Sequence, residues 1–537
     1  MQQSLSLKIL PSEASDSMVI TKKIAEFCGK AVNEITGFHL LKKSIDARAK
    51  MPLIQLSLLA FINEPFLERK KTTFHFHDVT KAKKNVIIIG TGPAGLAAAL
   101  LLIERGIKPI LLERGKDVRA RRRDLAVLNK EGLINPNSNY CFGEGGAGTY
   151  SDGKLYTRSN KRGNIERILN LFVHFGAEEN ILFDAHPHIG TNKLPAIIIA
   201  MRQLICDCGG EFHFDTRVID FVLLNDSIKA VKSSHGDEFK ADAFILATGH
   251  SARDIFTLLY QRNIKIEARP FALGVRIEHP QSLIDNIQYN CLSRGDDLPP
   301  ASYSLVQQVN DKGVFSFCMC PGGIIAPAST SENELVVNGW SPSRRNNIHA
   351  NSGMVVQVEI QDAINELLLA VNDEDNDQQK VDTNSPLLMM HFQQLIEKRA
   401  FTAGGGKFVA PAQRIIDFTR GKVSSTLPDC SYVPGIASSD LNTILPQFIA
   451  ERLSYALTSF GRKMKGYFTN EAVMVAIESR TSSPVRIPRD PVLLNHPQIR
   501  NLYPCGEGAG YAGGIVSAAM DGERVASAIV EAFSPKN

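Results

Sequence analysis

The chain is 537 residues long, has a formal net charge of +4 at pH 7, and is 44% hydrophobic and 22% charged. This length predicts several domains, roughly two to four, because single hydrophobic cores stop growing at smaller sizes. The average composition excludes global disorder. The slight charge excludes a whole-protein attraction to nucleic acid or to a membrane surface.

Two segments bear on location. The first residues, up to Asp16, lack the basic start, apolar core and cleavage site of a secretory signal. The apolar stretch Met51–Ile62 is interrupted by polar residues and is shorter than the ~20 residues that span a bilayer. We therefore expect a soluble, cytoplasmic protein without a membrane partner. The basic runs Lys81–Lys84 and Arg119–Arg123 are expected on solvated faces.

The nine cysteines are an odd number, which favours a reducing compartment over a disulfide framework. Two C-x-C pairs stand out: Cys206 with Cys208, and Cys318 with Cys320. Four thiolates can in principle bind zinc or an iron–sulfur cluster, but these pairs are far apart in the chain and neither has C-x-x-C spacing. We expect no metal site.

The first part of the chain predicts a small mixed α/β module. Apolar residues from Ile20 to Ala31 recur at helical spacing. The segments that read as strands are Ser4–Leu10, Phe38–Ile45, Leu53–Ile62 and Phe74–Val79. This part shows no local chemical motif, so we expect a packing or interaction unit.

The pattern changes at Asn85. The aliphatic run Asn85–Ile89 is typical of a strand buried on both faces of a parallel sheet. A glycine-rich turn, a helix at Leu96–Arg105 and a second apolar strand at Pro109–Leu112 complete a βαβ unit. Further helices and strands are expected at Asn164–Phe175, Leu194–Cys206, Gly210–Phe214, Arg217–Leu224, Ala241–Gly249, Asn501–Cys505 and Gly514–Phe533. The acidic, amide-rich stretch Asn372–Asn384 is expected to be a surface loop.

The turn after the first of these strands is a dinucleotide-binding fingerprint. GTGPAG, from Gly90 to Gly95, fits G-x-G-x-x-G, with Gly92 as its middle glycine, and connects a buried strand to a helix. Glu113 ends the next strand, where a carboxylate accepts hydrogen bonds from an adenosine ribose. The same spacing recurs in the loop Gly143–Gly148 and at Gly508–Gly513, but neither begins a second βαβ unit. We therefore predict one nucleotide site and no separate NAD domain.

Four further segments carry a family resemblance. They are FGEGGAGTYSDGKL from Phe142, LATGHSARD from Leu246, CMCPGG from Cys318, and the pair ESRTSSPVRIPRD from Glu478 with CGEGAGYAGG from Cys505. Together with SIDAR at Ser44, they make the chain resemble the uncharacterised FAD-dependent dehydrogenases called NAD(FAD)-utilising dehydrogenases. The resemblance covers nearly the whole chain. It implies FAD bound across the two ends of the chain.

The resemblance and the fingerprint together imply an α/β fold. We expect a small N-terminal α/β module at 1–80, a Rossmann-like FAD-binding domain made of the two segments 81–270 and 466–537, and an inserted α+β substrate domain at 271–465. The expected cofactor-binding residues are Gly90, Gly92, Pro93, Ala94, Gly95, Glu113, Arg114, Gly143, Gly145, Gly146, Ala147, Ser151, Asp152, Val218, Ala247, Thr248, Gly249, Gly506, Glu507, Gly513, Gly514 and Ile515.

Each candidate for the chemistry has more than one possible role. Cys318 and Cys320 are thiols that exchange electrons with the flavin or, alternatively, buried packing residues. Arg480 and Arg486, with Arg489, either clamp an anionic substrate, contact FAD phosphate or form salt links. Other polar candidates with an alternative structural role are Lys154, His186, His188 and His250.

The sequence thus predicts an FAD-dependent oxidoreductase in which flavin N5 passes a hydride to or from a small substrate, with NAD(P)H as a transient partner. The alternatives are a flavoprotein that acts on RNA, disfavoured by the near-neutral charge, and a non-enzymatic redox sensor or scaffold. The substrate and the oligomeric state do not follow from the sequence.

Overall fold

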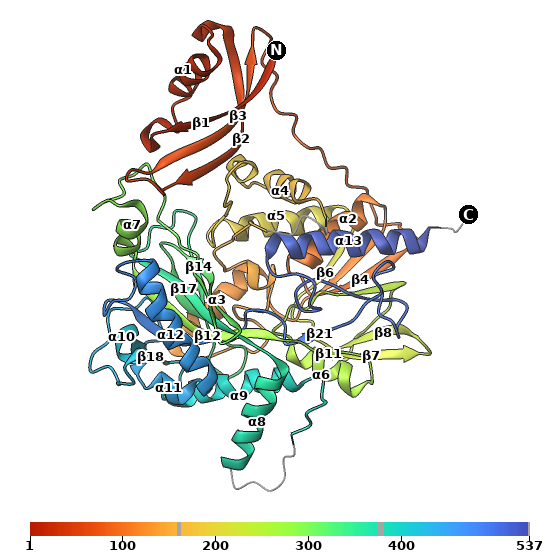
Figure 1. Cartoon of the computed structure of the whole chain (residues 1–537). Coiled ribbons are helices and arrows are strands. Elements are labelled where there is room, and N and C mark those ends of the chain that lie inside the picture. The colour runs from red at the N-terminus through yellow and green to blue at the C-terminus, as the bar shows by residue number, and fades with distance from the viewer. Residues whose placement is uncertain (158–162, 374–380, 535–537) are drawn as a thin grey trace.

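A computed structural model describes residues 1–157, 163–373 and 381–534. The N-terminal module stands at one end of the molecule, and the main body holds a parallel sheet and a larger, mostly antiparallel sheet (Figure 1). The chain enters the parallel sheet first, leaves it for the larger sheet, and returns to it for its last strand. The predicted α/β fold with an inserted unit is therefore confirmed.

The parallel sheet contains the predicted βαβ unit. Its described strands have the order β22 (Leu502–Pro504), β10 (Ala243–Leu246), β4 (Asn85–Ile89), β5 (Lys108–Leu112) and β6 (Glu211–His213). Successive residues of β4 point to opposite faces, and both faces are buried: Val86 and Ile88 belong to one apolar core, Ile87 and Ile89 to another. This double burial explains the uninterrupted aliphatic run in the sequence.

Helices cover one face of the parallel sheet and a small sheet covers the other. The helices are α2 (Pro93–Glu104), α4 (Ile165–His174), α5 (Leu194–Asp207) and α13 (Ile515–Phe533). The opposite face packs against α6 (Arg253–Gln261) and the sheet of β7 (Val218–Leu224), β8 (Ser227–Ser233) and β9 (Glu238–Phe239). The helix α3 (Val118–Glu131) follows β5. The last helix of the chain, α13, thus packs beside α2, the helix that follows the predicted nucleotide-binding turn (Figure 1).

The larger sheet has the strand order β13 (Val306–Val309), β14 (Lys312–Cys320), β17 (His349–Val358), β12 (Phe271–Pro280), β20 (Val473–Glu478), β18 (Ala410–Arg414) and β19 (Ile436–Ser438). Its helices are α7 (Gln281–Tyr289), α8 (Ile360–Asp373), α9 (Leu388–Ala403), α10 (Ile415–Thr419), α11 (Leu441–Ile444) and α12 (Gln447–Lys463). Two short ladders complete the body: β15 (Ile324–Pro327) with β16 (Val337–Trp340), and β11 (Glu267–Ala268) with β21 (Val485–Arg486). Residues 374–380 of the expected loop Asn372–Asn384 lie outside the described residues.

One expected boundary is wrong. The sequence placed 466–537 in the FAD-binding domain, but β20 pairs on one side with β12 and on the other with β18, inside the larger sheet. The six residues of β20 are all buried. A short apolar strand buried on both faces fits either sheet, so its pattern could not decide between them.

The N-terminal module has the order β1 (Gln2–Ile9), β3 (Leu53–Ile62), β2 (Ile35–Asp46), with α1 (Ser17–Cys28) packed on one face. The strand expected at Phe74–Val79 is not formed. This segment runs extended without a strand partner, and the rings of Phe74 and Phe76 pack against His174 of α4 instead. The alternating aromatic residues that predicted a strand are thus the residues by which this linker packs against α4.

Candidate active site

A cavity of about 410 Å³ lies where the parallel sheet meets the larger sheet. One end is lined by the turns that follow β4, β5, β10 and β22, and so by the carboxyl ends of parallel strands, where open α/β sheets bind ligands. The other end is lined by Phe317 and Cys318 of β14, Asn338 of β16 and Arg480, which follows β20. Both sheets contribute to one continuous site.

The turn after β4 is held by a buried carboxylate. Glu113 Oε2 accepts hydrogen bonds from the backbone N and the Oγ1 of Thr91, at 3.0 and 2.7 Å. Glu113 Oε1 accepts from the backbone N of Gly115 and of Gly143, both at 3.0 Å. Glu113 therefore ties three loops of the cavity wall together. A ribose contact of Glu113 stays a prediction.

The loop from Asn139 to Gly146 is organised around a buried guanidinium. Arg121 of α3 donates to the carbonyl oxygens of Asn139, Tyr140, Glu144 and Gly146 at 2.8 to 2.9 Å. Its side chain is completely buried. The expectation that the run Arg119–Arg123 forms a solvated face is thus wrong for Arg121, because converging loop carbonyls replace the water around its charge.

The turn after β22 is fixed from the last helix. Asp521 of α13 accepts from the backbone N of Gly506 at 2.8 Å and pairs through both carboxylate oxygens with Arg489, at 2.6 and 3.0 Å. Arg489 also lies over the ring of Tyr511, 3.7 Å from its centroid. The positions of Gly506 and Glu507 at the cavity are therefore set by a buried ion pair.

Two helix N-termini open onto the cavity. The α2 helix begins after Gly92 and α13 begins after Gly514, and residues of both starts line the cavity. Glycine has no side chain to accept the first backbone amides of either helix. The amides and the positive ends of two helix dipoles thus face the same space, an arrangement that favours a bound pyrophosphate.

Comparison with known proteins agrees with this geometry. Residues 83–127 match the family described as "FAD binding domain", and residues 270–481 match "FAD-dependent protein, C-terminal domain-like". Residues 1–61 match a domain of unknown function. An uncharacterised protein of Clostridium beijerinckii is 36% identical over 540 residues, covering 96% of this chain and 97% of the relative. The chain belongs to an uncharacterised family of FAD-dependent proteins.

Two solved structures match the chain at low similarity. Glycine oxidase from Bacillus cereus is 13% identical, with 84% of this chain and 96% of that chain covered and a TM-score of 0.30. A geranylgeranyl bacteriochlorophyll reductase-like protein from Thermoplasma acidophilum is 12% identical, with 84% and 78% covered and a TM-score of 0.35. The family assignment rests on the sequence matches, which make the chain an FAD-dependent protein.

The cavity fits the FAD of this family. Positions that line it have open space where a Cβ atom would project. Apart from their chain neighbours, Gly249, Gly513 and Gly514 have no atom within 4 Å of that point, and Gly92 has only the Cα of Gly146, at 3.9 Å. Gly90, by contrast, has a φ of +102° and approaches Ala247 so closely that a Cβ would lie 2.5 Å from its carbonyl oxygen. The wall is thus shaped for close approach of a ligand by backbone rather than by side chains.

The structure brings most expected cofactor residues to this cavity. All line it except Gly95, which packs against the carbonyl of Gly90, and Gly145, which lies against Ile198. Cavity residues that the sequence did not single out include Phe142, Tyr156, Thr216, Arg217, Phe317, Asn338 and Thr481. Of these, Phe317 and Asn338 come from strands whose sequence pattern is irregular, so no periodic signal was available to find them.

A charged cluster forms the end of the cavity near Cys318. Lys154 Nζ lies 3.7 Å from Cys318 Sγ and 3.6 Å from Asp152 Oδ2, and it also donates to the carbonyl of Met319. The same Asp152 oxygen accepts from Arg345 at 2.8 Å. Burial opposes the ionisation of Asp152, yet the two cations outweigh it, so the pKa of Asp152 is lowered.

The three candidate arginines do not converge. Arg480 lines the cavity, but Glu397 binds its Nη2 at 3.1 Å and Thr330 its Nη1 at 2.9 Å. Arg486 is exposed, outside the cavity lining, and lies over Tyr511. Of the three alternatives for these arginines, salt links describe Arg480 and Arg489, because Glu397 binds the first and Asp521 the second.

The histidine candidates separate clearly. His250 lines the cavity, with Nδ1 3.4 Å from Glu507 Oε1. His188 lies beside the cavity wall, where its backbone forms a bridge with Lys154 and its Nε2 lies 3.1 Å from the carbonyl oxygen of Ser343. Burial lowers the pKa of His188 to about 4. His188 is thus a neutral structural residue at ordinary pH, whereas His250 is placed to contact a ligand.

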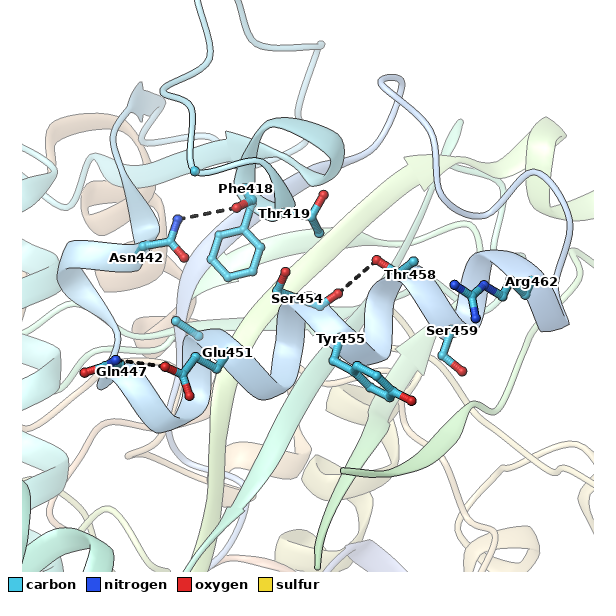
Figure 2. Close-up of a pocket in the computed structure, with 12 residues that line it drawn as sticks. Phe418, Thr419, Asn442, Gln447, Glu451, Ser454, Tyr455, Thr458, Ser459 and Arg462 are labelled. Carbon is cyan, nitrogen blue, oxygen red and sulfur yellow. Dashed lines mark hydrogen bonds between the residues drawn. The ribbon is translucent and has the colours of Figure 1, made fainter. Parts of the chain in front are cut away.

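A second concavity, of about 530 Å³, lies over α10, α11 and α12 (Figure 2). Its polar side chains bond locally: Asn442 with the Phe418 carbonyl, and Gln447 with Glu451. It shares no lining residue with the glycine-rich cavity.

Among the described residues, no helix is long and apolar enough to cross a bilayer. No group of three or more His, Cys, Asp or Glu side chains among these residues could hold a metal ion.

Proposed function

We propose that the chain transfers a hydride through N5 of FAD to or from a small substrate bound at the Cys318 end of the cavity. The observation that carries this proposal is the continuity of the cavity. Its glycine-rich end has the backbone amides that suit a dinucleotide, and its other end has the side chains of a different sheet, Phe317 and Asn338 among them. A cofactor and a second molecule would thus share one cavity.

The residues that would hold FAD follow from their chemistry. The starts of α2 and α13 would bind the pyrophosphate, and Arg114, stacked 4.0 Å from the ring centroid of Phe142, would border the adenosine end. Bound FAD supplies the hydride chemistry. The protein excludes water with Phe317 and keeps Lys154 charged at the far end through Asp152. Since the arginines do not converge, we assign the substrate no charge.

Anaerobic mixing with NADH or NADPH tests hydride transfer. The FAD-loaded protein is expected to lose its oxidised-flavin absorbance with one of these nucleotides, and more slowly when the transferred hydrogen is deuterium. Phe317→Trp should slow this reduction by filling the far end while FAD stays bound. Phe315→Trp, two residues earlier on the same strand and outside the cavity lining, is the matched control. Persistent oxidised absorbance with both nucleotides, in protein that dithionite still reduces, contradicts a nicotinamide partner.

A further inference from the structure

The wall of the cavity opposite the glycine turns carries two thiols. Cys318 lines the cavity, and Cys320 is completely buried behind it. Cys320 Sγ donates to the carbonyl oxygen of Cys318 at 3.3 Å. Two thiols separated by one residue at the wall of a ligand cavity are candidates to form and break a disulfide bond.

A β-bulge places Cys318 at this wall. Phe317 pairs with Gly353 of β17, and Cys320 pairs with Asn351, so β14 has one residue more than its partner between these two pairs. Cys318 lies in this bulge. Its φ of +44° is in the left-handed region, which residues other than glycine rarely adopt. Bulges of this kind redirect side chains beside active sites. Here the bulge turns Cys318 into the cavity.

Lys154 lies near both sulfurs. Its Nζ is 3.7 Å from Cys318 Sγ and 3.9 Å from Cys320 Sγ. The nearby carboxylate, Asp152, also serves Arg345, so one carboxylate faces two cations. A thiolate would be the second anion and would balance the charges of Lys154, Arg345 and Asp152.

The electrostatics distinguish the two thiols. The hydrogen bond from Cys320, together with Lys154 and Arg276, lowers the pKa of Cys318 despite its burial. The hydrogen bond to Cys318 and burial raise the pKa of Cys320. One sulfur is thus stabilised as a thiolate and the other as a thiol that keeps its proton.

We propose that Cys318 and Cys320 are a redox-active pair that exchanges two electrons with FAD; this rests on the cofactor placement of the proposed function. In the reductive direction, the Sγ–Sγ bond breaks and its two electrons come from reduced FAD, which returns to the oxidised form. Cys318 leaves as the thiolate beside Lys154, and Cys320 takes the proton that the anionic reduced flavin gives up. A disulfide across a single residue is strained, which favours its reduction.

Electron counting tests the pair. The FAD-loaded protein is oxidised with diamide, freed of excess reagent, and titrated with dithionite without oxygen. We expect the wild type to take up two more electrons per FAD than Cys320→Ser, and a peptide in which Cys318 and Cys320 are linked to appear only before the titration. Cys206→Ser/Cys208→Ser is the matched control, since it removes the other C-x-C pair, at the end of α5, where burial raises the pKa of both thiols.

Alkylation tests the thiolate without flavin reduction. Iodoacetamide should modify Cys318 well below the pH at which ordinary thiols react, and Lys154→Met should move this profile to higher pH, with about tenfold slower reaction for each unit of raised pKa. Lys154→Arg should keep the profile low, because it keeps the charge.

Equal electron uptake by the wild type and Cys320→Ser, or absence of the linked peptide, would overturn the pair. Reduction of FAD by NAD(P)H in Cys320→Ser would at the same time leave the proposed hydride transfer standing. Conversely, extra electron uptake from dithionite without any reaction with NAD(P)H supports the pair and counts against the nicotinamide partner.

Discussion

Arg276 Nε lies 2.7 Å from Glu478 Oε2, and the two side chains are 0% and 1% exposed. Arg276 joins β12 to β20 through this pair, and it also donates to Asn351 at 2.7 Å and to the Cys318 carbonyl at 3.3 Å. The backbone of the thiol bulge is therefore anchored to the centre of the larger sheet. The ion pair therefore supports the wall of the cavity, and neither of its side chains lines the cavity.

Removing one partner of this pair should strongly destabilise the fold. Arg276→Met leaves the carboxylate of Glu478 buried without its cation, which typically costs about 3–5 kcal/mol of the free energy of unfolding. Arg276→Met/Glu478→Met should recover part of this loss, because no lone charge remains. Denaturant unfolding measures both variants. The exposed pair Lys84–Asp242, with 49% and 31% exposure, is the control, and its loss should cost less than about 1 kcal/mol.

Two glycines of the turn after β4 should differ in what their replacement changes: Gly92 the affinity for FAD, and Gly95 the stability of the fold. At Gly92 a Cβ atom would meet only the Cα of Gly146, at 3.9 Å, and otherwise project into the cavity. Gly92→Ala should therefore fold and bind FAD about tenfold more weakly or worse, a loss of about 1.4 kcal/mol. At Gly95 a Cβ would lie 2.1 Å from the Gly90 carbonyl oxygen. Gly95→Ala should destabilise the protein by about 1–3 kcal/mol through overpacking.

Circular dichroism and FAD titration distinguish these outcomes. Gly106 has a φ of +72°, a Cβ atom added to it would have nothing within 4 Å, and it lies outside the cavity lining. Gly106→Ala should cost about 1 kcal/mol of stability from its backbone conformation and leave FAD affinity unchanged. Unaltered FAD binding by Gly92→Ala would show that the cofactor does not approach this turn.

The turn at Gly90 to Gly95 could be predicted from the sequence because all of its determinants are local: an apolar strand, three spaced glycines and a helix. The contact of Lys154 with Cys318 could not, since these residues are 164 positions apart and meet only when two sheets pack. Arg121 was missed for another reason. A run of arginines carries no periodicity that would mark one member as buried beneath loop carbonyls.

A short segment links the N-terminal module to the cavity wall. The backbone N of Lys43, on the edge strand β2, donates to the Phe183 carbonyl at 2.8 Å, and the Ala185 N donates back to Lys43 at 2.9 Å. A few residues after Ala185, the carbonyl oxygen of Pro187 accepts from the backbone N of Leu155 at 2.9 Å, and Leu155 is next to Lys154 in the chain. The segment 183–189 is thus hydrogen-bonded to the module at one end and to the cavity wall at the other.

Lys43→Pro should loosen this segment, because proline removes the donor to Phe183. We expect faster hydrogen exchange of the amides of Leu155 and Ile189, whose carbonyl acceptors are Pro187 and Gly153. Lys43→Ala keeps the backbone donor and is the control at the same position. If both variants exchange like the wild type, the module does not support the cavity wall, and the alternative of a redox sensor loses this route from the cavity to the module.

A buried histidine should make stability fall in mild acid. His279 of β12 is 1% exposed, its Nε2 is 2.9 Å from the Tyr467 carbonyl, and burial lowers its pKa to about 4. Below the ordinary pKa of about 6.5 the unfolded chain binds a proton that the folded protein does not, so stability falls as the pH drops from 6.5 towards 4. The slope contributed by His279 approaches about 1.4 kcal/mol per pH unit. Denaturant unfolding of His279→Asn, which keeps a donor for Tyr467, should lack this contribution, whereas the exposed His77→Asn should retain it. Identical pH slopes for His279→Asn and the wild type would mean that His279 is protonated in the folded protein.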